Sequence, residues 1–202
     1  GNTFAYCCNS PASMHDVCGT TGDYAYDRDK VIEYGRQYYN KQDPYYPKRS
    51  YRNNCVRFAS QCLYAGLGDD IIAEVYPEWH CYRNNQRDPE NPEEHDQTRS
   101  WRKTNYFYRF LMDSGLAYNT TRLYSGWDLG LMAEWFQYEP GDFLFFSNGN
   151  GADEFYHVAV VSAITENDIL FMGNTTDCFD ASLTAWFQEE KEVVIVCIAD
   201  QG

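Results

Sequence analysis

Apolar residues recur at helical spacing in several stretches of the first two thirds of the chain. Residues 27 to about 40 place Val31, Tyr34 and Tyr38 on one side, which predicts a helix that ends before the Pro-containing segment 43–47. The same spacing predicts a helix over 100 to about 114, and a shorter one over 127–136.

The most regular helical pattern begins at Cys55. Apolar or small residues follow at intervals of three and four along one face, which predicts a helix with one buried side, at Cys55, Phe58, Ala59, Cys62, Leu63 and Gly66. Asn53 or Asn54 is suited to cap its start, and Gly66 to close it. Cys55 would then lie in the first turn, where free N–H groups and the helix dipole favour an anion.

Short apolar runs separated by turn residues dominate the last third of the chain. They predict strands over 143–146, 156–162, 169–172 and 193–199. Helices followed by an antiparallel sheet indicate an α+β protein with its N-terminal helices packed on the sheet. We expect an irregular N-terminal arm over residues 1–26, a single domain over 27–202, and a long polar surface excursion within that domain over 69–98.

Composition limits the classes of partner. The chain carries 30 acidic and 16 basic residues, a formal net charge of -14, which argues against nucleic acid as a partner. No stretch approaches the roughly 20 apolar residues that span a bilayer, so we expect no membrane insertion. The 18 Tyr, 12 Phe and 5 Trp indicate aromatic packing and a groove able to hold peptide or sugar.

The eight cysteines are many for a cytosolic enzyme, and the chain starts at Gly1 rather than Met. We therefore expect a secreted or cell-surface protein whose signal peptide has been removed. His80, Cys81 and His95 match no zinc-ligand spacing, so we expect no metal and no organic cofactor.

Thiol catalysis requires a nucleophilic sulfur, a base that later protonates the leaving group, and a group that orients the base. Cys55 is the candidate nucleophile. Of the four histidines, His15 lies in the N-terminal arm, and His80 and His95 lie in the polar excursion. Only His157 begins a predicted strand, which makes it the candidate base.

A family resemblance joins these observations. The sequence is similar to the bacterial putative amidase domain, which resembles papain-like cell-wall amidases and endopeptidases, over about residues 24–190. The matching motifs are Asn54-Cys55 with Phe58-Ala59-Ser60-Gln61-Cys62-Leu63 and Ala65-Gly66, Ser100-Trp101, Pro140-Gly141-Asp142, and His157-Val158-Ala159-Val160-Val161. The resemblance implies a papain-like fold, Cys55 as the nucleophile and His157 as the general base and acid.

The resemblance also implies a third polar residue after the next strand. The family tends to have a histidine where this chain has Asn174, whose amide oxygen could orient an imidazole; Asp177 is the alternative. The oxyanion hole is expected to combine the Cys55 N–H with one donor from the preceding loop, where the candidates are Tyr46, Tyr51 and Asn53.

Two departures surround the nucleophile. The family usually has an aspartate before the cysteine and a Thr-Asn pair after it, whereas this chain has Asn54 before Cys55, and Val56 and Arg57 after it. Loss of the acid and gain of Arg57 predict a lower thiol pKa.

The function that follows is an exported cysteine amidase or peptidase. It would cleave an amide bond of peptidoglycan stem peptides or short peptides through a thioester. A catalytically inactive module of the same fold that binds a peptide or glycan is the alternative. A thioester attacked by an amine would instead make the enzyme a transferase, and nothing in the sequence separates transfer from hydrolysis.

Overall fold

The computed structural model describes residues 25–46, 54–70, 72, 76, 79–81, 97–124, 128–148, 154–187 and 192–199. Helical elements come first along the chain and most strands follow. In order, they are α1 (Arg28–Tyr38), α2 (Cys55–Leu67), η2 (Arg99–Trp101), α4 (Thr104–Asp113), β1 (Ala117–Tyr124), α5 (Leu129–Phe136), β2 (Phe143–Ser147), β3 (Phe155–Ile164), β4 (Ile169–Gly173), β5 (Cys178–Ser182), α6 (Leu183–Trp186) and β6 (Glu192–Ile198). None of the described helices is long and apolar enough to cross a membrane.

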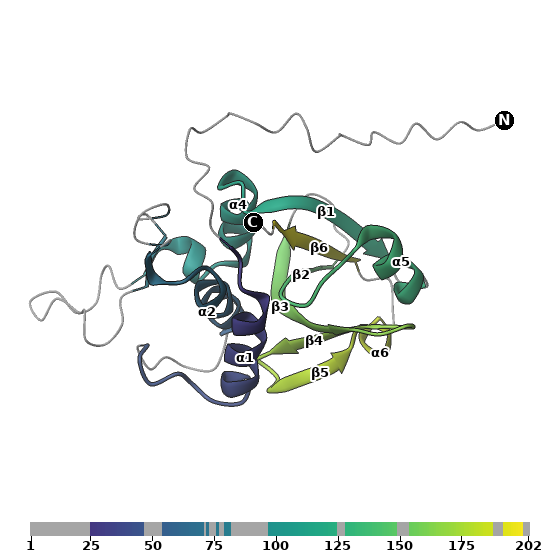
Figure 1. Ribbon diagram of the computed structural model, residues 1–202, viewed down its shortest axis with the longest axis horizontal. Coiled ribbons are helices and arrows are strands. Elements are labelled where there is room, and N and C mark those ends of the chain that lie inside the picture. Colours follow the sequence, from purple (N-terminus) through teal and green to yellow (C-terminus); the bar gives the residue numbers. More distant parts are fainter. Residues whose placement is uncertain are drawn as a thin grey trace, which may run out of the picture.

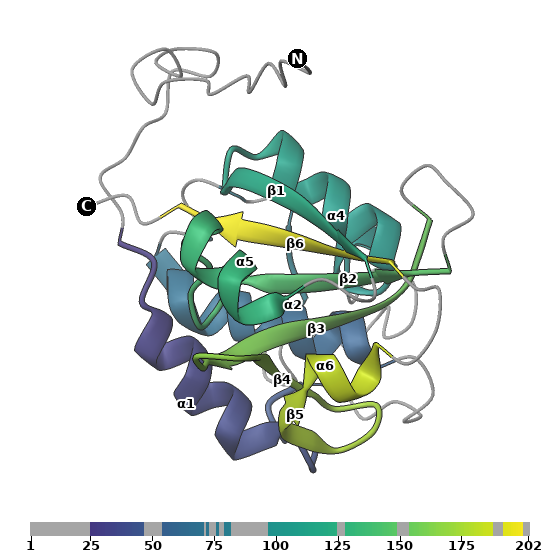
Figure 2. The same cartoon turned by 90° about the vertical axis from the view of Figure 1, so that its right-hand side faces the viewer.

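The strands form a six-stranded antiparallel sheet in the order β1-β6-β2-β3-β4-β5. Helices α1, α2 and α4 cover one face of the sheet, and α5 and α6 lie on the other (Figures 1 and 2). Each interior strand sends alternate side chains to the two faces, as the pleat requires. In β3, Val158 and Val160 pack under α2, while Ala159 and Val161 join the core beneath α5 and α6.

The predicted α+β class is confirmed. The expected helices over 27–40 and 127–136 correspond to α1 and α5, and the side chains of Asp27 and Asp128 cap them by accepting from backbone N–H groups. The expected helix over 100–114 is divided into η2 and α4. The four predicted strands correspond to β2, β3, β4 and β6.

Two strands and one short helix were not predicted. Strands β1 and β5 are the two edges of the sheet, and both bury few side chains. Helix α6 is a single turn that follows β5. An edge strand lacks a clear apolar alternation, because one of its sides has no neighbouring strand and its faces are only partly covered.

The end of α2 differs from the expectation. The helix continues past Gly66 and ends at Leu67, with Gly68 as its C-cap at φ 85°. Gly66 instead allows a close approach of α1, because a β-carbon there would lie 2.6 Å from atoms of Tyr26 and Val31. Gly66 therefore does not end α2 but allows the helix to pack closely against Tyr26 and Val31.

The polar stretch 69–98 also differs from the expectation of a surface excursion. Its described residues include Ile72, Tyr76 and Trp79, all of which are buried. The ring of Trp79 stacks on Trp101 and on Phe110 of α4, with centroid distances of 4.9 and 4.7 Å. This part of the chain therefore contributes to the core that supports α2.

Candidate active site

Cys55 is the first residue of α2, and its side chain is buried against the sheet, with 5% of the residue exposed. The sulfur faces the backbone N–H groups of Val56 and of Cys55 itself at the start of the helix, the N–H of Val158 in β3, and the hydroxyl of Thr175. The N–H of Val158 is available because the pairing of β3 with β4 ends at Val160 and Met172. Several donors from three segments thus converge on one sulfur atom.

Burial decides the ionisation of this thiol. It raises the pKa of Cys55 above the ordinary value, although the N–H groups of Val158 and Val56 and the hydroxyl of Thr175 act in the opposite direction. The expectation of a lowered thiol pKa is therefore wrong, because desolvation outweighs the helix start. At neutral pH the resting sulfur is a thiol surrounded by groups that would stabilise a thiolate.

His157 lies next to Val158 in β3, but its ring is on the other face of the sheet. The imidazole packs on Phe146, with ring centroids 5.4 Å apart, and Phe146 belongs to the core beneath α5 and α6. Among the described residues no hydrogen bond joins His157 to Cys55 or to Asn174. Burial lowers the pKa of His157 to about 4, so the imidazole is neutral at neutral pH.

Asn174 is almost completely buried, at 1% exposure, and it connects three segments. Its Nδ2 donates to the carbonyl oxygens of Tyr38 (2.7 Å), Tyr39 (3.1 Å) and Lys41 (3.1 Å) at the C-terminal end of α1. Its Oδ1 accepts from Nδ2 of Asn54, the residue before Cys55. The side chain therefore satisfies helix-end carbonyls and holds the start of α2 in place.

The expected cap of α2 has a different role. Asn54 occupies the N-cap position, but its side chain makes no capping hydrogen bond and instead bonds to Asn174. The alternative third residue, Asp177, is exposed, with φ 49°. Of the expected oxyanion donors, Tyr46 is buried with its ring 5.8 Å from that of Trp101, while Tyr51 and Asn53 lie outside the described residues.

The described residues contain no group of three His, Cys, Asp or Glu side chains placed to hold a metal ion. His80 and Cys81 are among those residues, and His95 is outside them. Thr175 and the N–H of Val158 are the polar groups at the thiol that the sequence analysis did not identify. No local pattern marks either of them, since each reaches Cys55 only through the packing of α2 on the sheet.

Comparison with known proteins gives the chain its family. The family model described as the putative amidase domain matches residues 25–196, most of the chain. The chain belongs to this family. A segment of 43 residues is 40% identical to the Uncharacterized protein YhbB of Bacillus subtilis (strain 168), which covers 21% of this chain and 13% of the relative. No solved structure matches the chain significantly.

Proposed function

We propose that this member of the putative amidase family is an exported cysteine hydrolase with a papain-like mechanism. Its substrates would be peptidoglycan stem peptides or short peptides, and Cys55 would be the nucleophile. The observation that carries the proposal is the position of the Cys55 sulfur at the start of α2, where N–H groups from the helix and from β3 converge on it. The family description as an amidase domain supports the reaction class.

In the proposed reaction the thiol gives its proton to His157 as Sγ attacks the carbonyl carbon of the amide. The N–H groups of Cys55 and Val158, which face the sulfur, would be the donors that stabilise the oxyanion. As the tetrahedral intermediate collapses, the C–N bond breaks and the imidazolium returns the proton to the leaving amine. Water then attacks the thioester with His157 as base, which releases the acid and restores the thiol. No cofactor enters this scheme.

His157 must leave Phe146 to act as the base in this scheme. Backbone N–H groups of a strand lie in the plane of the sheet, so the Cys55 sulfur facing the N–H of Val158 lies beside the strand rather than on one face. In the proposed mechanism the side chain of His157, whose Nε2 lies 4.0 Å from where a β-carbon of Gly173 would be, would reach that position by a change of its χ angles. The resting imidazole is neutral and therefore free to accept a proton, but a pKa of about 4 makes it a weak base toward this thiol.

Purified protein incubated with peptidoglycan fragments and short peptides tests the proposal, with products followed by mass spectrometry. Cys55→Ala should abolish product release. Cys62→Ala is the matched control, because Cys62 is a fully buried cysteine on the same helix whose raised pKa has burial as its only cause. Product release by Cys55→Ala at the wild-type rate would refute the role of the thiol.

A second candidate function is a binding module that holds a peptide or glycan without cleaving it. The packing of His157 on Phe146 and the raised pKa of Cys55 favour it. In that case the wild-type protein and Cys55→Ala should bind the fragments with equal affinity, and neither should release a product.

A further inference from the structure

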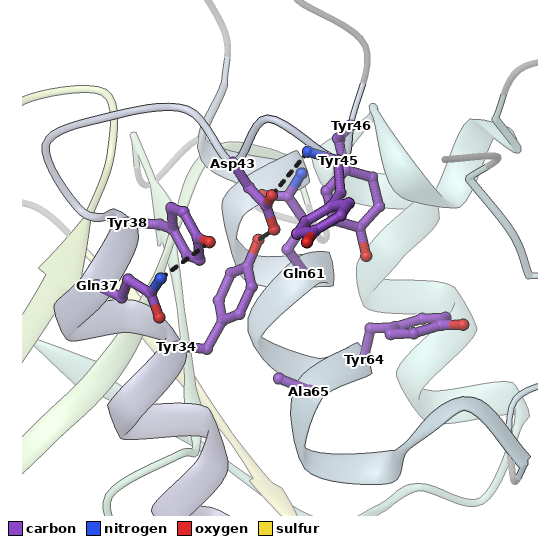
Figure 3. Close-up of a pocket in the computed structure, with 9 residues that line it drawn as sticks. All are labelled: Tyr34, Gln37, Tyr38, Asp43, Tyr45, Tyr46, Gln61, Tyr64 and Ala65. Atoms are coloured by element: carbon purple, nitrogen blue, oxygen red, sulfur yellow. Dashed lines mark hydrogen bonds between the residues drawn. The ribbon is translucent and has the colours of Figure 1, made fainter. Parts of the chain in front are cut away.

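A cavity of about 300 Å³ lies between α1, α2 and the segment that follows α1. Tyrosine rings dominate its wall, at Tyr34, Tyr38, Tyr45 and Tyr46, and the carboxylate of Asp43 lies among them (Figure 3). Cys55 and His157 do not line it. The cavity is therefore separate from the candidate active site, and nothing in the proposed mechanism uses it.

Asp43 is buried, with 7% of the residue exposed. The hydroxyl of Tyr34 donates to its Oδ2 (2.8 Å), and the backbone N–H of Tyr45 donates to its Oδ1 (2.9 Å). Within the described part of the chain, no Lys, Arg or His forms an ion pair with this carboxylate. A carboxylate withdrawn from water is costly unless a cation or several donors compensate it, and each oxygen can accept more than one hydrogen bond. Among the described residues, this carboxylate has hydrogen-bond donors but no cationic side chain as a direct partner.

The surrounding rings are suited to supply the rest of a cation site. The ring centroids of Tyr34 and Tyr38 lie 4.7 Å apart, and Tyr45, which also lines the cavity, is 64% exposed. Aromatic faces carry a negative potential that attracts ammonium groups. The Nζ of Lys41 already lies 5.5 Å from the centroid of the Tyr38 ring, so a ring of this cluster takes a cation on its face.

From this geometry we infer that the cavity binds an organic cation, a primary or quaternary ammonium group, between the Asp43 carboxylate and the tyrosine rings. An anion would be repelled by the carboxylate. The formal net charge of -14 would further raise the local concentration of a cationic ligand.

If the proposed function holds, the cavity selects amine-bearing peptide substrates; this part of the inference rests on that function. Gln61 of α2 lines the cavity six residues after Cys55, which corresponds to about 9 Å along the helix at 1.5 Å per residue. An extended peptide covers that distance in about three residues. The recognised ammonium group would thus lie two or three residues from the bond that Cys55 attacks.

Titration of the full chain with butylammonium and tetramethylammonium tests the inference, with n-butanol as the neutral probe and chemical shifts or calorimetry as readout. The ammonium probes should bind at least tenfold more tightly than butanol. Asp43→Asn, which retains acceptor and donor atoms but removes the charge, should weaken ammonium binding about tenfold or more. Circular dichroism establishes whether this variant is folded.

Tyr45→Leu provides a second variant that leaves the core intact, because the side chain is largely exposed. It should weaken ammonium binding about two- to fivefold, the loss expected for one exposed cation–π contact. The matched control is Trp135→Leu on α5, an aromatic residue 65% exposed on the other side of the sheet, which should change nothing. Equal binding of butanol and butylammonium, or an equal loss in the Tyr45 and Trp135 variants, would overturn the inference.

These titrations need no catalysis, and repeating them on Cys55→Ala separates the two proposals. Ammonium binding by a wild-type protein that cleaves no peptide would refute the proposed function but support the cation site. Peptide cleavage by a protein that does not distinguish ammonium from butanol would refute the cation site alone.

Discussion

Replacement of Asn174 by alanine should destabilise the protein more than any exposed substitution near the candidate active site. The side chain joins the end of α1 to the residue that precedes Cys55. Its removal leaves the amide of Asn54, itself only 9% exposed, without its Asn174 partner. The carbonyl oxygens at the end of α1 lose their donor at the same time.

The magnitude follows from these contacts. A net hydrogen bond contributes about 1 kcal/mol, and a buried polar group left without a partner costs about 1–3 kcal/mol. The four hydrogen bonds of Asn174 share two N–H protons and one amide oxygen, so their loss, with partial orphaning of the partners, gives a decrease of about 3–4 kcal/mol in the free energy of unfolding. For a chain of this size, that corresponds to a decrease of about 10 °C in Tm.

Urea unfolding followed by circular dichroism measures this change. Asp177→Asn is the control, because the residue is exposed and asparagine tolerates its positive φ; it should stay within about 0.5 kcal/mol of wild type. Asn174→Asp should be as destabilising as alanine at pH 7, since a carboxylate would face backbone carbonyls. Wild-type stability of Asn174→Ala, together with loss of peptide cleavage, would refute the structural role and indicate instead that Asn174 orients His157.

Three further results are expected. Acidification from pH 6.5 toward 4 should lower the free energy of unfolding of the wild type by about 2–3 kcal/mol, because His157 takes up a proton near pH 6.5 in the unfolded chain but only near its pKa of about 4 in the folded protein. The free energy of unfolding of His157→Gln should fall less over the same range. An equal shift of the urea midpoint between pH 7 and 4.5 in the two proteins would contradict this. Gly130→Ala should cost about 2 kcal/mol or more, because its β-carbon would collide with the carbonyl of Glu166. Gly115→Ala meets open space and should cost only about 1 kcal/mol from its positive φ of 74°, so equal losses would contradict the collision. Iodoacetamide should label Cys55 slowly at pH 7, and the labelling rate should rise about tenfold per pH unit as the pH approaches the raised pKa of the thiol. Peptide mass spectrometry measures this rate. Rapid labelling at pH 7 would instead mean that the thiolate is already stabilised.

The interior of the fold was predictable from local patterns because burial is strong there. The strands β2 and β6 bury every residue along their length, and α2 buries one complete face, so the apolar pattern marks them. The edge strands β1 and β5 escaped prediction because solvent and polar contacts reach them. In β1, for example, Arg122 pairs with Glu192 of β6 across the strands. Such a contact leaves no apolar signature.

The sequence by itself determined that a cysteine begins a helix, that a histidine stands near the start of a strand, and that helices precede an antiparallel sheet. Only the tertiary structure decided what these residues touch. Asn54 and Asn174 are 120 positions apart, so their bond depends on how α1, α2 and β4 pack together.

The face that His157 occupies is set by the pleat of β3, whose pairing with β2 runs without a shift from Phe143↔Val160 to Phe146↔His157. A shift of one residue in the strand pairing moves a side chain to the opposite face of the sheet, and the local sequence does not determine that register. The candidate nucleophile could therefore be predicted from the residues next to it in the sequence, whereas the groups that contact it belong to distant segments and meet it only through packing.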